Sequence, residues 1–494
     1  MKKRLQYWIL ILFYGAILWF GSIANVRASE LPQSNANHVL ERLSFGITSE
    51  QIKTVKAKGI EAYIQSQLEP SSVPESAIAK KYIAEFEDNY QPPLKLQRKF
   101  DNYQKKIRQD SDLSPEKKQD LLDRRNNLRR KSKEEVTKLR LARAIYSSRQ
   151  LQEVMVDFWF NHFNVFANKA LAGFWLSDYE NEIRDRALGN FRDLLGVTAS
   201  NPAMLIYLDN QYNTDPSSPL AKNRYKGLNE NYARELMELH TLGVDSGYSQ
   251  ADIITLAKIF TGWTVNYRGK TTNENGFHFN AKRHDSGEKT FLGHKIPAGG
   301  IEQGKQALDI LAAHPATAHF ISYKLAQYFV ADEPPADLVD SLANKFLDSQ
   351  GNIKVVMNAL IHSPEFSDPQ YSKQKFTTPY QYLISLVRMA EIEQPNFRRL
   401  QGMLGQLSMP LYMCVPPTGY RNTQDAWLNP QAILQRIAFA TAISNDTLNK
   451  ESPVEYERVV GNIGNLSSQT KRVIANSPKL RTALILGSPE AMYR

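Results

Sequence analysis

A helix is predicted most clearly by Asn229-Glu-Asn-Tyr-Ala-Arg-Glu-Leu-Met-Glu-Leu-His-Thr-Leu-Gly243, which opens with a capping residue and closes with glycine. The same punctuation recurs nearby: Ser249 with Asp252 predicts the next helix start, and Pro315 opens another helix. Further helical patterns cover residues 336–362, 377–392, 398–408 and 429–445. We therefore predict a mostly α fold with one large multi-helix domain.

Four polar residues of the 229–243 stretch share one face of this helix. They are Asn231, Arg234, Glu235 and Glu238, spaced i, i+3, i+4 and i+7. Such a face suits either a divalent metal with acid–base catalysis or a structural network of ion pairs. His240 points roughly 200° away from Glu238 on a regular helix, so both can bind one metal only if the helix ends or distorts between them. His240 can instead interact with the helix dipole.

A second polar group lies in Asp157-Phe-Trp-Phe-Asn-His-Phe-Asn164, where Asn161, His162 and Asn164 stand among large aromatic residues. A buried histidine with satisfied hydrogen bonds is the common outcome in such surroundings. A converging carboxylate or a second histidine would make His162 a metal ligand instead.

The segment 263–296 departs from the helical pattern, because short runs of β-type residues alternate there with polar turns. We predict a small β-ribbon inserted around residues 264–296. The run Phe277-His-Phe-Asn-Ala-Lys-Arg-His-Asp-Ser-Gly-Glu-Lys289 places His278, His284 and Asp285 in or beside this ribbon. Histidine and aspartate are good ligands for divalent metals, although the spacing matches no established zinc signature.

These stretches yield two sets of candidate site residues. The candidate catalytic residues are Arg234, Glu235, Glu238 and His240. The candidate metal ligands are His162, His284 and Asp285, with a divalent metal as the candidate cofactor.

Basic residues gather in the segment 95–143, which carries 17 Lys or Arg against 8 Asp or Glu. The whole chain has a formal net charge of +10, so the rest of the chain contributes almost none of it. Apolar residues at helical spacing and Ser114-Pro115, a helix start, predict a protruding helical hairpin. This hairpin is either a solvated surface or a docking site for an anionic polymer or a partner.

The N-terminal residues 1–28 show the order of a secretory signal peptide: Lys2-Lys3-Arg4, an apolar run over 7–23, and Val26-Arg27-Ala28 before the cleavage point. We therefore expect a secreted or periplasmic protein that does not meet nucleic acid. If the run is not cleaved, it stays as a membrane anchor. The expected organisation is 1–28 signal peptide, 29–93 N-terminal helical part of the core, 94–143 basic hairpin insertion, and 144–494 main helical domain.

Several classes of protein are excluded or disfavoured. The single cysteine, Cys414, rules out an internal disulfide and a cysteine-type zinc site. The chain has no His-Glu-x-x-His and no Gly-x-Ser-x-Gly motif. Gly299-Gly-Ile-Glu-Gln-Gly-Lys305 has the spacing of a phosphate loop, but Gln306 replaces the Ser or Thr that holds magnesium.

The chain resembles the large bacterial family catalogued as domain of unknown function 1800. The motifs that carry the resemblance are His38-Val-Leu-Glu-Arg-Leu-Ser-Phe-Gly46, Phe158-Trp-Phe-Asn-His-Phe163, the 229–243 stretch, Phe260-Thr-Gly-Trp263, His284-Asp285 and Gly487-Ser-Pro-Glu490. Two features depart from the family pattern. The Pro-Pro motif, which normally runs on to Gly-Trp, reads Pro416-Pro-Thr-Gly-Tyr420, and the basic hairpin looks like an insertion.

The resemblance implies a secreted, mostly helical protein that acts beside an exported partner similar to sulfatases and alkaline phosphatases. It supplies no activity, so two functions stay open. The first is a metal-assisted hydrolase of the cell envelope or of extracellular polymers. The second is a non-catalytic assembly or binding protein. The enzyme requires His162, His284 and one of the carboxylates to converge within roughly 5 Å beside a cleft.

Overall fold

The computed structural model describes residues 33–110, 113–225, 227–244, 246–267, 275–445 and 454–494. The chain is 66% helical, and the described residues include two small two-stranded antiparallel sheets. The predicted mostly α fold with a small β insertion is therefore confirmed. The predicted signal peptide lies outside the described residues. Among the residues that are described, no helix is long and apolar enough to cross a membrane.

Short helices build the N-terminal part: α2 (Gln33–Leu43), α3 (Ser49–Lys58), α4 (Ile60–Leu68) and α5 (Ala77–Asn89). Their boundaries follow local chemistry. The hydroxyl of Thr48 accepts a hydrogen bond from the N–H of Gln51, and the Gln51 side chain accepts one from the N–H of Thr48. This capping box starts α3, and Gly59, with φ of 84°, ends it.

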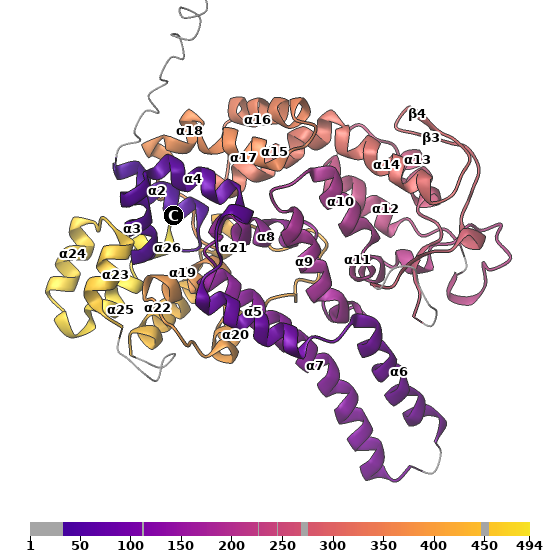
Figure 1. The fold of residues 1–494 in the computed structure, drawn as a ribbon, viewed down its shortest axis with the longest axis horizontal. Helices are drawn as coiled ribbons and strands as arrows, with labels where there is room; N and C mark the ends of the chain where they lie inside the picture. The colour runs from indigo at the N-terminus through magenta and orange to yellow at the C-terminus, as the bar shows by residue number, and fades with distance from the viewer. Residues whose placement is uncertain (1–32, 111–112, 226, 245, 268–274, 446–453) are drawn as a thin grey trace, which may run out of the picture.

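The predicted hairpin is formed by α6 (Pro93–Gln109) and α7 (Pro115–Tyr146), which project from the body of the molecule (Figure 1). Ser114 caps α7 by accepting a hydrogen bond from the N–H of Lys117. The buried residues of α7 all fall between Val136 and Ile145. The last turns of α7 therefore belong to the core, and the projecting part of the hairpin ends before residue 143.

The core is built around α8 (Gln150–His162), in which nearly every side chain is buried. It packs against α9 (Leu176–Arg186), and α10 (Phe191–Ser200) and α11 (Pro202–Tyr207) follow. The indole groups of Trp159 and Trp175 are fully buried and donate hydrogen bonds to main-chain carbonyls. The richly apolar composition after residue 143 thus forms one continuous hydrophobic core.

The middle of the chain carries the sheets. After α12 (Asn231–Glu235) and α13 (Gln250–Ile259), β1 (Trp263–Val265) pairs with β2 (Phe277–Phe279), and β3 (Lys289–Phe291) pairs with β4 (His294–Ile296). Helices then resume with α14 (Ile301–Ala313), α15 (Pro315–Phe329), α16 (Ala336–Asp348), α17 (Ile353–Ile361) and α18 (Pro364–Ser367).

The C-terminal part is helical and returns to the centre of the molecule. It contains α19 (Pro379–Met389), α20 (Phe397–Gln406), α21 (Gln424–Trp427), α22 (Pro430–Ser444), α23 (Tyr456–Ile463), α24 (Ser468–Ala475), α25 (Arg481–Leu486) and α26 (Pro489–Met492). The backbones of Lys375 and Arg494 exchange two hydrogen bonds, of 3.2 and 3.0 Å. The C-terminal end consequently lies among buried elements near α2 (Figure 1).

Candidate functional site

A cavity of about 350 Å³ opens beside the end of α8. One wall is the 157–162 motif, a second wall is α15, and a third is the loop between α20 and α21. The residues that line it are Asp157, Phe158, Asn161, His162, Leu239, Phe320, Tyr323, Lys324, Gln327, Tyr328, Thr378, Met409, Thr418, Tyr420, Arg421, Asn422 and Thr423. The motif that the sequence singled out therefore borders a concave site.

The two asparagines of this motif hold the third wall in place. The amide of Asn161 donates to the Tyr420 carbonyl and accepts from the Tyr420 N–H, both at 2.7 Å. The Asn164 amide donates to the carbonyls of Cys414 and Pro416. Both side-chain amides thus provide hydrogen-bond partners for main-chain groups of the loop. The sequence analysis noted these polar residues but did not predict this role.

Gly419 is required where this loop meets α8. Its φ is +70°, and a Cβ atom at this position would lie 2.2 Å from the carbonyl oxygen of Asn161. Only glycine combines this backbone conformation with so close an approach. The Pro-Pro-Thr-Gly-Tyr motif is therefore a structural element of the cavity wall.

His162 is buried and neutral. Its Nε2 lies 3.1 Å from the main-chain oxygen of His240, and burial lowers the pKa of His162 to about 3. Because a carbonyl can only accept, Nε2 carries the proton and Nδ1 keeps its lone pair. No side chain or main-chain group among the described residues hydrogen-bonds to Nδ1. His162 thus offers one hydrogen-bond acceptor, and no charge, at the cavity.

The 229–243 stretch is helical as predicted, but it is not a regular helix. Residues Leu236–Thr241 form a π-helical turn, so the helix does distort between Glu238 and His240. The distortion does not unite the two side chains. His240 is buried against the rings of His162 and Phe163, where burial lowers its pKa well below 6.5.

The polar face of α12 forms a ladder of ion pairs. The Arg234 guanidinium lies 3.4 Å from Glu230 and 3.3 Å from Glu238, and it donates to Gln250 at 2.9 Å. Glu235 is half-buried, and burial followed by the nearby charge of Glu238 raises its pKa. This arrangement matches the structural alternative that the sequence left open.

His284 and Asp285 also have partners within the protein. The Nδ1 atom of His284 lies 2.9 Å from the main-chain oxygen of Thr261, and burial lowers the pKa of His284. Asp285 lies 3.2 Å from the ammonium of Lys289, which also donates to Gln303. The Phe-Thr-Gly-Trp motif therefore positions these side chains in the β region.

The predicted metal set requires a correction. Within the described ranges, no three or more His, Cys, Asp or Glu side chains are grouped so that they could hold a metal ion. His162, His284 and Asp285 do not form one ligand set, because His162 faces His240 while Asp285 is paired with Lys289. Sequence spacing suggested ligands of the right type, but their neighbours are carbonyls, an ammonium group and aromatic rings.

The comparison with protein families agrees with the observed motifs. The chain belongs to the family described as Protein of unknown function (DUF1800). The match covers residues 38–493, which confirms the predicted resemblance. No curated protein and no solved structure matches this chain.

A buried charge network supports the cavity of this DUF1800 protein. Arg140 lies 2.8 Å from Asp157 and 3.1 Å from Glu180, and Glu180 also pairs with Arg184. Burial raises the pKa of Glu180, but the two arginines outweigh this effect and lower it to about 2. The sequence analysis missed Arg140 and Glu180. Charged residues within the apolar turns of two helices were the available signal.

Lys324 on α15 is the one cavity residue whose charge is not matched by the described protein. It is half-buried, and burial lowers its pKa. No carboxylate within the described part of the chain pairs with its ammonium group, which lies 5.6 Å from the centre of the Phe320 ring. Asp157 lines the same cavity, but its carboxylate is bound by Arg140 and by the Tyr328 hydroxyl. The cavity therefore presents one cation without a counter-charge.

Proposed function

We propose that this DUF1800 protein is an exported, non-catalytic binding protein of the cell envelope, and that its cavity holds an anionic group of a ligand against Lys324. The observation that carries the proposal is the half-buried ammonium group without a carboxylate partner in the described structure. An anionic ligand group would restore the interactions that the ammonium loses on leaving water.

The remaining walls of the cavity support the same ligand. The ring of Phe158 lies nearly parallel to that of His162, at 11°, and Phe320 closes another side. These apolar surfaces suit a ligand that has an uncharged body. The neutral Nδ1 of His162 can accept a hydrogen bond from a ligand hydroxyl, whereas Lys324 recognises the charge.

The hairpin formed by α6 and α7 supports a second contact of the same binding protein. The segment 95–143 carries a net positive charge, and the hairpin projects from the body (Figure 1). We propose that it docks an anionic polymer or the exported sulfatase- or phosphatase-like partner that the family resemblance implies. Such a contact should weaken as salt concentration rises.

The metal-assisted hydrolase is the weaker alternative because its predicted groups have other partners. Arg234 neutralises Glu238, and Lys289 neutralises Asp285. Metal analysis of the purified protein distinguishes the two functions. A divalent metal at one equivalent, lost in a Glu235→Gln variant, would favour the hydrolase.

The binding proposal is tested by calorimetric titration with glucose 6-phosphate and with glucuronate as anionic probes. Loss of one charge-assisted hydrogen bond of about 1.5–3 kcal/mol should weaken binding at least about tenfold in Lys324→Gln. The matched control is Lys345→Gln, which removes an exposed lysine from α16 and should bind as the wild type does. Absence of binding to both probes, or equal binding by both variants, would contradict the proposal.

A further inference from the structure

Two arginine side chains are buried near each other at the C-terminal segment. Arg42 on α2 is 0% exposed, and Arg494 is 6% exposed. Each donates a hydrogen bond to a main-chain oxygen: Arg42 to Tyr371 at 2.6 Å, and Arg494 to Tyr328 at 3.1 Å. Burial, followed by the charge of Arg494, lowers the pKa of Arg42 to about 9. The short segment 371–375 joins them, because Tyr371 accepts from Arg42 and the backbone of Lys375 pairs with that of Arg494. Two like charges in one buried cluster repel each other.

Most of their donor capacity is unused. The Nε and Nη1 atoms of both Arg42 and Arg494 are buried, and none has a hydrogen-bond partner among the described residues. The Tyr328 ring lies 4.8 Å from the guanidinium carbon of Arg494 and offsets part of its lost hydration. A buried charged donor without a hydrogen-bond partner destabilises the folded protein, so an acceptor that binds at this site would stabilise it.

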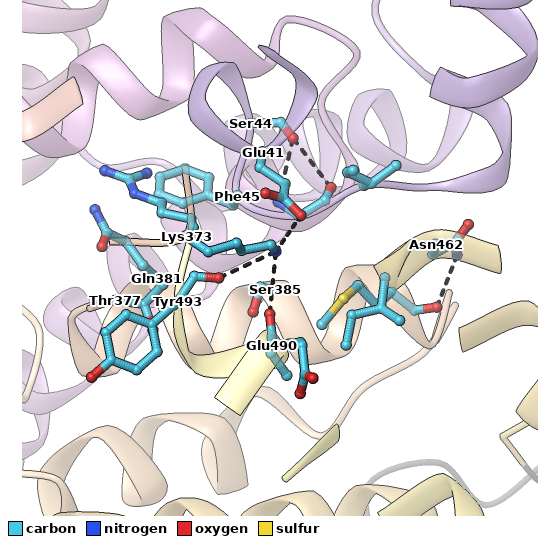
Figure 2. A pocket seen from close by; sticks show the side chains of 16 residues that line it. Glu41, Ser44, Phe45, Lys373, Thr377, Gln381, Ser385, Asn462, Glu490 and Tyr493 are labelled. Carbon is cyan, nitrogen blue, oxygen red and sulfur yellow. Dashed lines mark hydrogen bonds and ion pairs between the residues drawn. The ribbon is translucent and has the colours of Figure 1, made fainter. Parts of the chain in front are cut away.

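Nearby carboxylates are already engaged by lysines. Figure 2 shows the ammonium of Lys373 paired with Glu41 and directed at the main-chain oxygens of Glu490 and Tyr493, at 3.2 and 3.3 Å. These residues and Arg494 line a cavity of about 40 Å³. The cavity has room for a small ion or for water, but not for a sugar.

Asp332 is the second nearby carboxylate, and it is ion-paired with Lys375, whose side chain is 1% exposed. The described cluster thus holds four cationic side chains, Arg42, Lys373, Lys375 and Arg494, and three carboxylates, Glu41, Asp332 and Glu490. The Glu490 carboxylate is bonded by Ser467 and Thr470, and none of the three accepts from Nε or Nη1 of the two arginines.

We propose that a small inorganic anion, of the size and charge of chloride, binds between the guanidinium groups of Arg42 and Arg494. The anion accepts hydrogen bonds from their Nε and Nη1 atoms, separates the two positive charges and links α2 to the C-terminal segment. This site does not depend on the ligand proposed for the larger cavity.

The test compares thermal unfolding in sodium chloride, sodium bromide and sodium gluconate at equal ionic strength. Halides should raise the Tm by about 2 °C or more relative to gluconate, with a saturating dependence on concentration. Anomalous diffraction from crystals grown in bromide should show a peak within hydrogen-bond distance of both guanidinium groups. Equal Tm values in the three salts, or a water molecule in place of the peak, would overturn the proposal.

A variant pair separates this effect from general salt effects. Arg42→Gln should lose the halide dependence and should be less destabilised in gluconate than in chloride, because it removes one of the repelling charges. Arg283→Gln is the control, since Arg283 is also buried but donates to the Thr214 hydroxyl and to the main-chain oxygens of Gln211 and Asn213, outside the cavity. It should retain the halide dependence, and loss of that dependence in both variants would contradict a specific site. If Arg42→Gln does not fold, the bromide peak in the wild type decides the question.

Discussion

The polar face of α12 and the cavity wall on α15 differ in whether their charged side chains have partners of opposite charge. On α12, Arg234 lies between Glu230 and Glu238 of the flanking turns, so both carboxylates have an oppositely charged partner within one helical turn. On α15, Lys324 stands half-buried without a carboxylate partner in the described structure. The comparison shows that charged residues close together in sequence can pair with one another, whereas a single charged residue in a cavity can lack such a partner.

The largest expected effect contrasts the charge network beneath the cavity with the ladder on α12. Arg140→Met leaves Asp157 and Glu180 buried with fewer partners, and it should lower the free energy of unfolding by about 3–5 kcal/mol. Arg234→Met should lower it by less than about 1 kcal/mol, because those ion pairs are partly exposed. Urea unfolding measures both, and equal losses would remove the distinction between the two regions.

The next effect concerns the loop that forms the third wall. Gly419→Ala should destabilise the protein by about 1–3 kcal/mol and should weaken probe binding, since its Cβ would collide with Asn161. Gly405→Ala on α20 is the matched control, because nothing lies within 4 Å of a Cβ there. That control should be neutral or stabilising by about 1 kcal/mol or less. A neutral Gly419→Ala would show that the loop is not fixed as described.

Helix boundaries could be predicted because they depend on local chemistry. Capping at Thr48, Ser114 and Ser249 needs only a hydroxyl and the backbone that follows it. The local residue pattern did not predict the π-helical turn at Leu236–Thr241, in which His240 is buried against the rings of His162 and Phe163.

A smaller effect appears as acid sensitivity at the cavity. The pKa of His162 is about 3 in the folded protein and near 6.5 when unfolded, so the unfolded chain binds more protons between these values. The contribution of His162 is present above pH 6.5 and is lost as pH falls, by roughly 2 kcal/mol at pH 5. Unfolding of His162→Asn should depend less on pH in this range. An unchanged pH profile would contradict a buried, neutral His162.

The pKa of the exposed His362 is shifted in the opposite direction, so its contribution to stability has the opposite pH dependence. Burial lowers the pKa of His362, but the hydrogen bond to Glu61, the hydrogen bond to the Asn358 carbonyl and the charge of Glu61 together outweigh this effect and raise the pKa above 6.5. Its stabilising contribution is present below pH 6.5 and is lost as pH rises through the folded pKa. His362→Gln should therefore lose stability mainly at low pH, and a loss confined to high pH would argue against the pair with Glu61.

The candidate site could be predicted only in part. The sequence located the 157–164 motif because polar residues among aromatics are unusual, and this motif does border the cavity. It could not show that Asn161 binds the backbone of Tyr420, or that Lys324 lacks a partner. The partners of a side chain depend on which distant segments lie beside it in the fold, and the local residue pattern does not contain this information.

The central claim is that the ammonium group of Lys324 binds an anionic group of a ligand in the cavity. Nuclear magnetic resonance of methyl-labelled lysines, assigned with Lys324→Gln, gives the pKa of Lys324 directly. Burial should hold that pKa below 10.5 in the free protein, and bound glucose 6-phosphate should raise it. A pKa near 10.5 that does not change with the probe would contradict the account.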